Sequence, residues 1–338
     1  MIRRKLMGLA TFAALAGLGL AAHAEPDYPS RPVKLIVPFP AGGTSDIMGR
    51  MLAEELSKAL KQPFVVENIS GAGGTVGAER AAKAAPDGYT LLLSGVGQNA
   101  VAHGLNPKLA YDSTKDFVQI TQVHSGPNVL VVHPGTPFKT FKELVDHGMA
   151  NAGKLSYGYT HASSGHMAME LLKQTVSTCT GSKTASQSCK GLFMVGIPYR
   201  GGGPMMTDLL GGQIPLMFIN QDTALPYVKA GKLRALAVTS VQRNPLYPDV
   251  PSISELGYPG FSALSWSGLS APKGTPQAIV DRLEAAAVNA MKTPAISARM
   301  QSQGFVVPPL GSAPYTQFVS REIDRWGRVI KIAGIKAE

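Results

Sequence analysis

The hydrophobic and polar positions of this chain alternate between short apolar runs and longer amphipathic segments. In the first part, apolar runs cover residues 33–39, 64–69 and 90–94, and amphipathic segments cover 47–60 and 76–85. The apolar runs are rich in Val, Ile and Leu, which is typical of parallel strands covered by helices on both faces. This part therefore predicts a β-α-β-α-β unit.

The same order restarts farther along the chain. The second set is predicted to comprise strands at 155–160, 195–199, 214–219 and 233–239 and helices at 163–176 and 205–210. Two extended passages, 117–133 and 261–271, separate this set from the rest. Helices that include 275–291 and 315–332 finish the chain.

We therefore expect an α/β protein of two lobes joined by two extended crossing strands. Two lobes are also expected because single hydrophobic cores stop growing at roughly 250–300 residues. The first lobe is expected to comprise residues 25–125 and 262–338, because the C-terminal helices return to it. The second lobe is expected to comprise residues 126–261.

The first 24 residues have the pattern of a secretory signal peptide. A basic start with Arg3, Arg4 and Lys5 precedes an uncharged stretch at 6–22, and small residues surround Ala24. The stretch is shorter than the roughly 20 apolar residues that span a membrane, so an uncleaved anchor is the less favoured alternative. We expect cleavage after Ala24 and a periplasmic protein.

The net charge is compatible with an anionic ligand. The formal charge of +10 falls to +7 when the signal peptide and its three basic residues are removed. The chain after the signal peptide has no run of Lys or Arg, so a nucleic-acid-binding surface is not predicted. A small anion or an acidic partner surface fits this charge better.

The two cysteines, Cys179 and Cys189, lie in one polar segment. In an exported protein a disulfide between them is the default expectation. A metal site would need a tighter spacing such as C-x-x-C, and no His lies between the two. We therefore expect a disulfide, and no metal site.

Glycine-rich turns follow the strands of the first lobe. The first turn enters a helix through Pro40, Ala41, Gly42, Gly43, Thr44, Ser45 and Asp46. The first turn of a helix leaves N–H groups unpaired, so this junction suits an anion, although a turn without a ligand has the same pattern. Thr44 or Ser45 is expected to cap the helix, with Asp46 as the alternative. Gly73 lies in the next such turn, and Ser94 ends the third strand.

Similar junctions occur in the second lobe. One contains Thr160, Ser163, Ser164, Gly165 and His166, with Ser163 or Ser164 at the helix cap. Another contains Arg200, Gly201 and Gly202. Arg200 can bind a carboxylate through two hydrogen bonds or can be a solvated surface charge. Asp222 follows the strand at 214–219, where it either faces the ligand or caps a helix that begins near Thr223.

Several motifs that carry chemistry are absent from the sequence. It lacks the G-x-G-x-x-G and G-x-x-x-x-G-K-[ST] loops of nucleotide sites, the G-x-S-x-G elbow of hydrolases and the H-E-x-x-H metal motif. We therefore expect no cofactor, no metal and no catalytic residues. A periplasmic hydrolase of a carboxylate ester or amide remains the alternative, because catalytic triads are spatial arrangements.

Several segments together resemble one known family. These segments are YPSRPVKLIVPFPAGG at 28–43 with Asp46, VENISGAGGT at 66–75, APDGYT at 85–90, YRGG at 199–202, GKLRALAVTS at 231–240 and APKGTP at 271–276. They make the chain similar to the solute-binding proteins of tripartite tricarboxylate transporters, also called the Bug family. The resemblance spans nearly all of the chain after residue 24.

The resemblance implies a periplasmic-binding-protein fold of the type II kind, without enzymatic activity. Lobe closure would trap a small carboxylate and deliver it to a membrane permease, and some members pass the ligand to a sensor kinase instead. The turn at 40–46 would bind one carboxylate through backbone groups and water, and Gly73, the segment 163–166, the turn at 201–203 and Asp222 would complete the pocket.

Two departures from the family pattern are present. Ser163-Ser164-Gly165-His166 stands where the family has Gly-Ser-x-x-His, and the segment with the two cysteines is an insertion. Di- and tricarboxylates, amino acids and aromatic acids all remain candidate ligands. An apolar cleft wall that includes Phe39 and Val96 would favour an aromatic acid.

Overall fold

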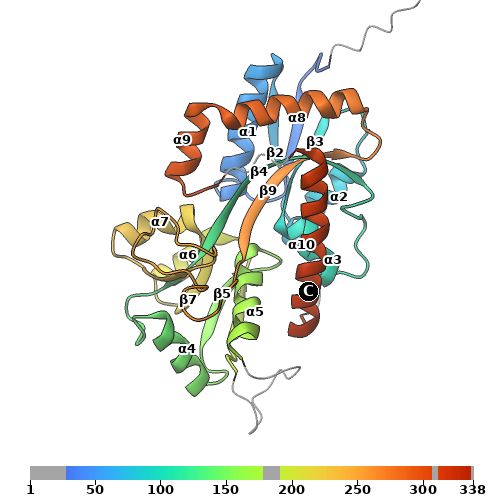
Figure 1. The fold of residues 1–338 in the computed structure, drawn as a ribbon. Helices are drawn as coiled ribbons and strands as arrows, with labels where there is room; N and C mark the ends of the chain where they lie inside the picture. The colour runs from blue at the N-terminus through green and yellow to red at the C-terminus, as the bar shows by residue number, and fades with distance from the viewer. Residues whose placement is uncertain (1–27, 178–190, 307–310, 336–338) are drawn as a thin grey trace, which may run out of the picture.

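The computed structural model describes residues 28–177, 191–306 and 311–335 (Figure 1). The predicted signal peptide and both cysteines lie outside the described residues, so the expected cleavage and disulfide stay predictions. Within the described residues, no helix is both long enough and apolar enough to cross a membrane.

The first lobe is built on three parallel strands in the order β2 (Phe64–Asn68), β1 (Val33–Val37) and β3 (Thr90–Gly95). Alternate side chains of β1 enter two cores. Leu35 packs with α1 (Thr44–Leu60) and α8 (Gln277–Lys292) on one face. Ile36 packs with Ala78 and Ala81 of α2 (Thr75–Ala82) on the other face. Both faces are covered, as the unbroken apolar runs predict.

The second lobe repeats this arrangement. Its strands are β5 (Ser156–Thr160), β6 (Val195–Tyr199), β7 (Leu216–Asn220) and β8 (Arg234–Val238). β5 is parallel to both β6 and β7. Helices α4 (Phe141–Ala150) and α5 (Ser164–Val176) share a core with Leu130 and Val132. Helices α6 (Gly202–Leu210) and α7 (Gln221–Lys229) pack on the opposite face.

Two strands cross between the lobes, as the sequence predicts (Figure 1). β4 (Phe117–Val132) pairs with β9 (Leu264–Pro272) in antiparallel fashion from Phe117 to Pro127. The last residues of β4, from Asn128 onward, instead pair with β7 and β8. One continuous strand therefore belongs to both lobes, and the α/β fold of two lobes with two crossing strands is confirmed.

The final helix, α10 (Ser312–Ala333), lies along both lobes rather than beside the first alone (Figure 1). It contacts α3 (Ala102–Leu105) in the first lobe and α5 in the second. Gln174 on α5 donates to the backbone oxygen of Val329 on α10 at 2.8 Å. A helix with such contacts limits the directions in which the lobes can move. The residue boundaries of the lobes stay a prediction.

Several local elements differ from the sequence-based expectation. Residues 97–105, for which the sequence analysis predicted no element, form a π-helix at Gly97–Val101 that continues into α3. α4 was not predicted, although Thr140 caps it by accepting from the N–H of Glu143. α9 (Pro294–Ser302) follows α8 and begins with a proline, which suits a first helical position.

Candidate functional site

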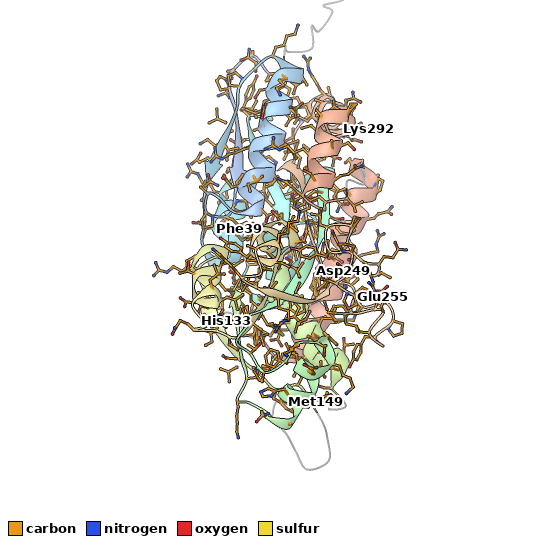
Figure 2. All side chains as sticks on the ribbon, turned by 90° about the vertical axis from the view of Figure 1, so that its left-hand side faces the viewer. Phe39, His133, Met149, Asp249, Glu255 and Lys292 are labelled. Carbon is orange, nitrogen blue, oxygen red and sulfur yellow. The ribbon has the colours of Figure 1, made fainter. Side chains whose placement is uncertain are left out.

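A cavity of about 780 Å³ lies between the two lobes and meets the crossing strands. Phe39, which lines it, lies at mid-height of the molecule between the lobes (Figure 2). Most of the residues predicted to bind the ligand line this cavity. They are Pro40, Ala41, Gly42, Gly43, Thr44, Ser45, Ser94, Thr160, Ser163, Ser164, Gly165, Arg200, Gly201 and Gly202.

Four predicted residues do not line the cavity: Asp46, Gly73, His166 and Asp222. Each of these four residues lies elsewhere in the structure, next to residues that do line the cavity. Asp46 lies behind the first turn, and His166 is buried beneath the start of α5. Gly73 and Asp222 lie where the two lobes touch.

Asp46 holds the first turn in shape. Its buried carboxylate accepts hydrogen bonds from the N–H of Gly42 at 3.0 Å, from Arg50 at 3.0 Å and from Asn68 at 2.9 Å. Burial favours a raised pKa for Asp46, but the bonds from Arg50, Gly42 and Asn68 outweigh it and lower the pKa below its usual value. Asp46 is therefore ionised at neutral pH and supports the turn without lining the cavity.

The start of α1 differs from the prediction at its cap. Gly43 occupies the cap position, and neither Thr44 nor Ser45 caps the helix through its side chain. A Cβ added to Gly43 would have no protein atom nearer than Pro40 O at 4.0 Å. The protein's own packing therefore does not require glycine here, and the space beside the backbone is open to the cavity.

The start of α5 is capped as predicted. Ser163 accepts a hydrogen bond from the N–H of His166 at 3.1 Å, and Ser164 donates to Asn128 Oδ1 at 3.1 Å. The ring of His166 stacks on Tyr159 with centroids 4.3 Å apart. Burial lowers the pKa of His166 to about 3, so this side chain is neutral and cannot supply a positive charge.

The lobes touch at two places beside the cavity. At the first, Thr44 Oγ1 lies 2.9 and 3.1 Å from the two carboxylate oxygens of Asp222 and donates to them. At the second, Gly73 faces Ala162, whose Cβ would be 2.7 Å from any Cβ added to Gly73. These contacts hold the lobes in a closed arrangement.

Asp222 lies in the first turn of α7. This helix begins at Gln221 rather than near Thr223, so Asp222 does not precede it. Its carboxylate accepts from Thr44 of the other lobe and is absent from the cavity lining. Burial raises the pKa of Asp222, and hydrogen bonds from Thr44 and from the backbone N–H groups of Thr223 and Asp222 only partly offset this.

The crossing strands contribute lining residues that the sequence did not reveal. These are Asn128 on β4 and Ser265, Trp266 and Ser267 on β9. Asn128 is fully buried, and its amide donates to Ala263 O at 2.9 Å while its Oδ1 accepts from Ser164. β4 contains several other polar residues, such as Gln119 and His124, so the local sequence does not distinguish Asn128 as a lining residue.

Ser267 is paired with a buried histidine. Its Oγ lies 2.6 Å from Nδ1 of His124 on β4. Burial lowers the pKa of His124 to about 3, so its ring is neutral near pH 7. Its Nε2 atom has no hydrogen-bond partner, which leaves the imidazole without a third group to orient it.

The apolar part of the lining has two sources. Phe39 and Val96, which the sequence analysis proposed for a cleft wall, both line the cavity. The second lobe adds Met205, Met206 and Leu210 from α6. From the same lobe, β7 adds Phe218 and Ile219, and α7 adds Tyr227.

Comparisons with known proteins agree with this architecture. The profile of the "Tripartite tricarboxylate transporter family receptor" matches residues 48–335. Protein BugT of Bordetella pertussis is 36% identical over 336 residues, covering 98% of this chain and 98% of that protein.

Two solved structures with bound acids are also similar. R. palustris Rpa4515 with adipate has a TM-score of 0.83 and 33% identity, covering 92% of this chain and 99% of that one. MatC from Rhodopseudomonas palustris with bound malate has a TM-score of 0.80 and 34% identity, covering 90% of this chain and 100% of that one.

Proposed function

This chain belongs to the tripartite tricarboxylate transporter receptor family, and we propose that it binds a small carboxylate in the cavity between its lobes. Receptors of this family are periplasmic solute-binding proteins. The observation that carries the proposal is the position of the first glycine-rich turn. Its open backbone and the start of α1 meet a cavity that both lobes enclose.

The anionic head of the ligand lies at the turn formed by Ala41–Ser45. Backbone N–H groups at the start of a helix carry a partial positive charge and stabilise an anion. Asp46 prevents this turn from rearranging, because it anchors the N–H of Gly42 from behind. The similar proteins with adipate and with malate support a carboxylate as the bound group.

Ligand capture proceeds by closure of the lobes. The first turn belongs to the first lobe, while Ser163, Ser164 and Gly201 line the cavity from the second. Contacts from both sides form only when the lobes meet, and so does the bond between Thr44 and Asp222. A ligand that touches both lobes therefore shifts the population toward the closed form.

A hydrolase is less well supported than a receptor. Ser267 and His124 are a serine–histidine pair at the cavity. A general base works best when its pKa is near the operating pH, whereas burial lowers the pKa of His124 to about 3. No carboxylate among the described residues contacts the Nε2 atom of His124, so the pair lacks the orienting third member.

The remaining roles follow from family membership. We propose that a signal peptide is removed after Ala24, and that Cys179 and Cys189 form a disulfide. The partner that receives the ligand is the permease of a tripartite tricarboxylate transporter, with a sensor kinase as a further partner.

The proposal is tested by thermal shift of the exported, purified protein against mono-, di- and tricarboxylates and aromatic acids. A ligand present at 100 times its Kd stabilises the folded protein by about 2.7 kcal/mol. We expect at least one carboxylate to raise the melting temperature while uncharged analogues do not. Equal shifts by the matched amides, or release of a hydrolysis product, would contradict the receptor proposal.

A further inference from the structure

The cavity lining offers very little positive charge. Arg200 is the only charged side chain among the described residues that line the cavity, and it is exposed. Each ionised carboxylate that leaves water needs a compensating charge or several hydrogen bonds. The turn at 41–45 supplies N–H groups for one head group. The starts of α5 and α6 also line the cavity, and Arg200 is the single cation that the described lining adds to them.

Part of the cavity lining is apolar. Met206 and Leu210 of α6 and Tyr227 of α7 line the cavity and belong to one hydrophobic cluster. Ile219 of β7 belongs to the same cluster and also lines the cavity, and its Cδ1 is 3.4 Å from a Cβ added to Gly202. Leu210 and Tyr227 are only partly buried.

The cavity has two chemical environments, a polar one at the first turn and a more apolar one on α6 and α7. Many polar lining residues lie at strand ends and on the crossing strands, as Ser94, Asn128 and Ser267 do. Helices α6 and α7 add two polar residues, Thr207 and Thr223, beside their apolar ones. The apolar group on α6 and α7 belongs entirely to the second lobe. A ligand that fills both environments has a polar head toward the first lobe and an apolar body toward the second.

We propose that the ligand is a carboxylate with a single ionised head group and an apolar aliphatic or aryl tail, whose tail lies against Met206, Leu210 and Tyr227. This inference rests on the proposed function, and it selects one class among the carboxylates. The volume of about 780 Å³ is within the range of cavities that enclose much larger ligands than a four-carbon acid.

The side chains of this region suit a tail of variable shape. Methionine has three rotatable bonds and a polarisable sulfur, so Met205 and Met206 can adjust to aliphatic or aromatic surfaces. Tyr227 adds an aromatic face, which prefers an offset or edge contact with another ring. A carboxylate at the tail end of the ligand would be desolvated here without a cation, and this disfavours diacids.

The first test compares acids of matched length by isothermal titration calorimetry. Hexanoate and adipate have the same carbon chain, but adipate has a second carboxylate. We expect hexanoate to bind at least tenfold more tightly than adipate, and affinity to rise about threefold to fourfold for each methylene from butanoate to hexanoate. 3-Phenylpropanoate should bind at least as tightly as hexanoate.

The second test changes the apolar region itself. Leu210→Asn places an amide against the tail, whereas Leu225→Asn makes the same change on α7 at a partly buried position that does not line the cavity. We expect Leu210→Asn to weaken hexanoate at least tenfold and acetate less than threefold. Leu225→Asn should leave both affinities within threefold, and melting curves of both variants establish that they fold.

The outcomes separate the two proposals. Tighter binding of adipate than hexanoate, or equal effects of the two Asn variants on hexanoate, would overturn the apolar-tail inference while a carboxylate receptor stands. If none of the acids tested binds, the proposed function is overturned, and the inference with it.

Discussion

Thr44 and Asp222 are 178 residues apart in the chain, yet the hydroxyl of Thr44 lies 2.9 Å from one carboxylate oxygen of Asp222 and 3.1 Å from the other. Thr44 is in the first turn of α1 and Asp222 in the first turn of α7, so this contact joins the two lobes. Because the two residues belong to different lobes, separation of the lobes breaks this contact. Its strength therefore contributes to the closed population, and through it to the apparent affinity for the ligand.

Removal of this contact is predicted to weaken ligand binding. A hydrogen bond to a charged group contributes about 1.5–3 kcal/mol, so Asp222→Ala should raise the Kd by about tenfold or more. The side chain is absent from the cavity lining, so the effect would act through closure. Asp249→Ala, at an exposed position of the second lobe, is the control. Equal Kd values for the two variants, by calorimetry, would show that the contact does not stabilise the closed form.

Enlarging Gly43 is predicted to reduce affinity without unfolding the protein. Its backbone angles are those of ordinary extended residues, and an added Cβ meets no protein atom within 4.0 Å. Gly43 is the N-cap of α1, where alanine is less favourable than glycine, so Gly43→Ala should lower the free energy of unfolding by only about 1 kcal/mol and leave the protein folded. The new methyl group enters the space assigned to the ligand head, so we expect the Kd to rise at least tenfold.

Gly327→Ala on α10 is the matched control for this variant. It too has open space around an added Cβ, but it is far from the cavity lining. Alanine in a helix is more stable than glycine by about 1 kcal/mol, so this control should unfold at a higher temperature and bind normally. A normal Kd for Gly43→Ala would exclude the first turn as the place of the head group.

Loss of the Asp46 carboxylate is predicted to loosen the first turn. Asp46→Ala leaves the N–H of Gly42 and the amide of Asn68 without this acceptor. We expect a lower affinity for the ligand, because the turn no longer has a fixed shape, together with a protein that still folds. Calorimetry gives the affinity, and hydrogen exchange at Gly42 should become faster. Unchanged exchange and affinity would contradict the supporting role.

Acidification is predicted to destabilise the protein through two buried histidines. Burial lowers the pKa of His124 and of His166 to about 3, whereas an unfolded histidine has a pKa of about 6.5. Between these values the unfolded chain binds protons that the folded protein does not, so stability falls as the pH falls. Each group contributes a slope of about 1.4 kcal/mol per pH unit in the middle of this range.

Urea unfolding at several pH values between 4 and 7 measures this slope. His124→Gln removes one of the two groups and should make the dependence shallower by roughly that amount. The raised pKa of Asp222 acts in the opposite direction, because the folded protein takes up that proton first. The same slope in wild type and His124→Gln would show that His124 is accessible to protons in the folded state.

The sequence reveals the first turn and the α5 start because their signals are local. A strand followed by glycines such as Gly42 and Gly43, or by a serine such as Ser163, predicts a helix start from nearby residues alone. The long extended passage that became β4 is recognisable for the same reason. The family segment at 28–43, with Asp46, strengthens the assignment of the first turn, whereas no such segment covers the α5 start.

Other parts of the site depend on contacts between distant segments. Asp222 resembles a helix cap in sequence, and only the approach of α1 turns it into a partner of Thr44. Ser267 reaches the cavity because β9 crosses between the lobes beside β4. Met206 follows the spacing of a core residue on α6, and its role in the lining depends on where α7 packs. No local pattern distinguishes these three roles.

The position of the bound acid, in a crystal structure of the receptor with its tightest-binding carboxylate, tests the central claim most directly. The account predicts one carboxylate group within hydrogen-bonding distance of backbone N–H groups in the turn Ala41–Ser45, between lobes closed by the Thr44–Asp222 contact. An acid bound outside the cavity, or one that leaves the turn unoccupied, would contradict it.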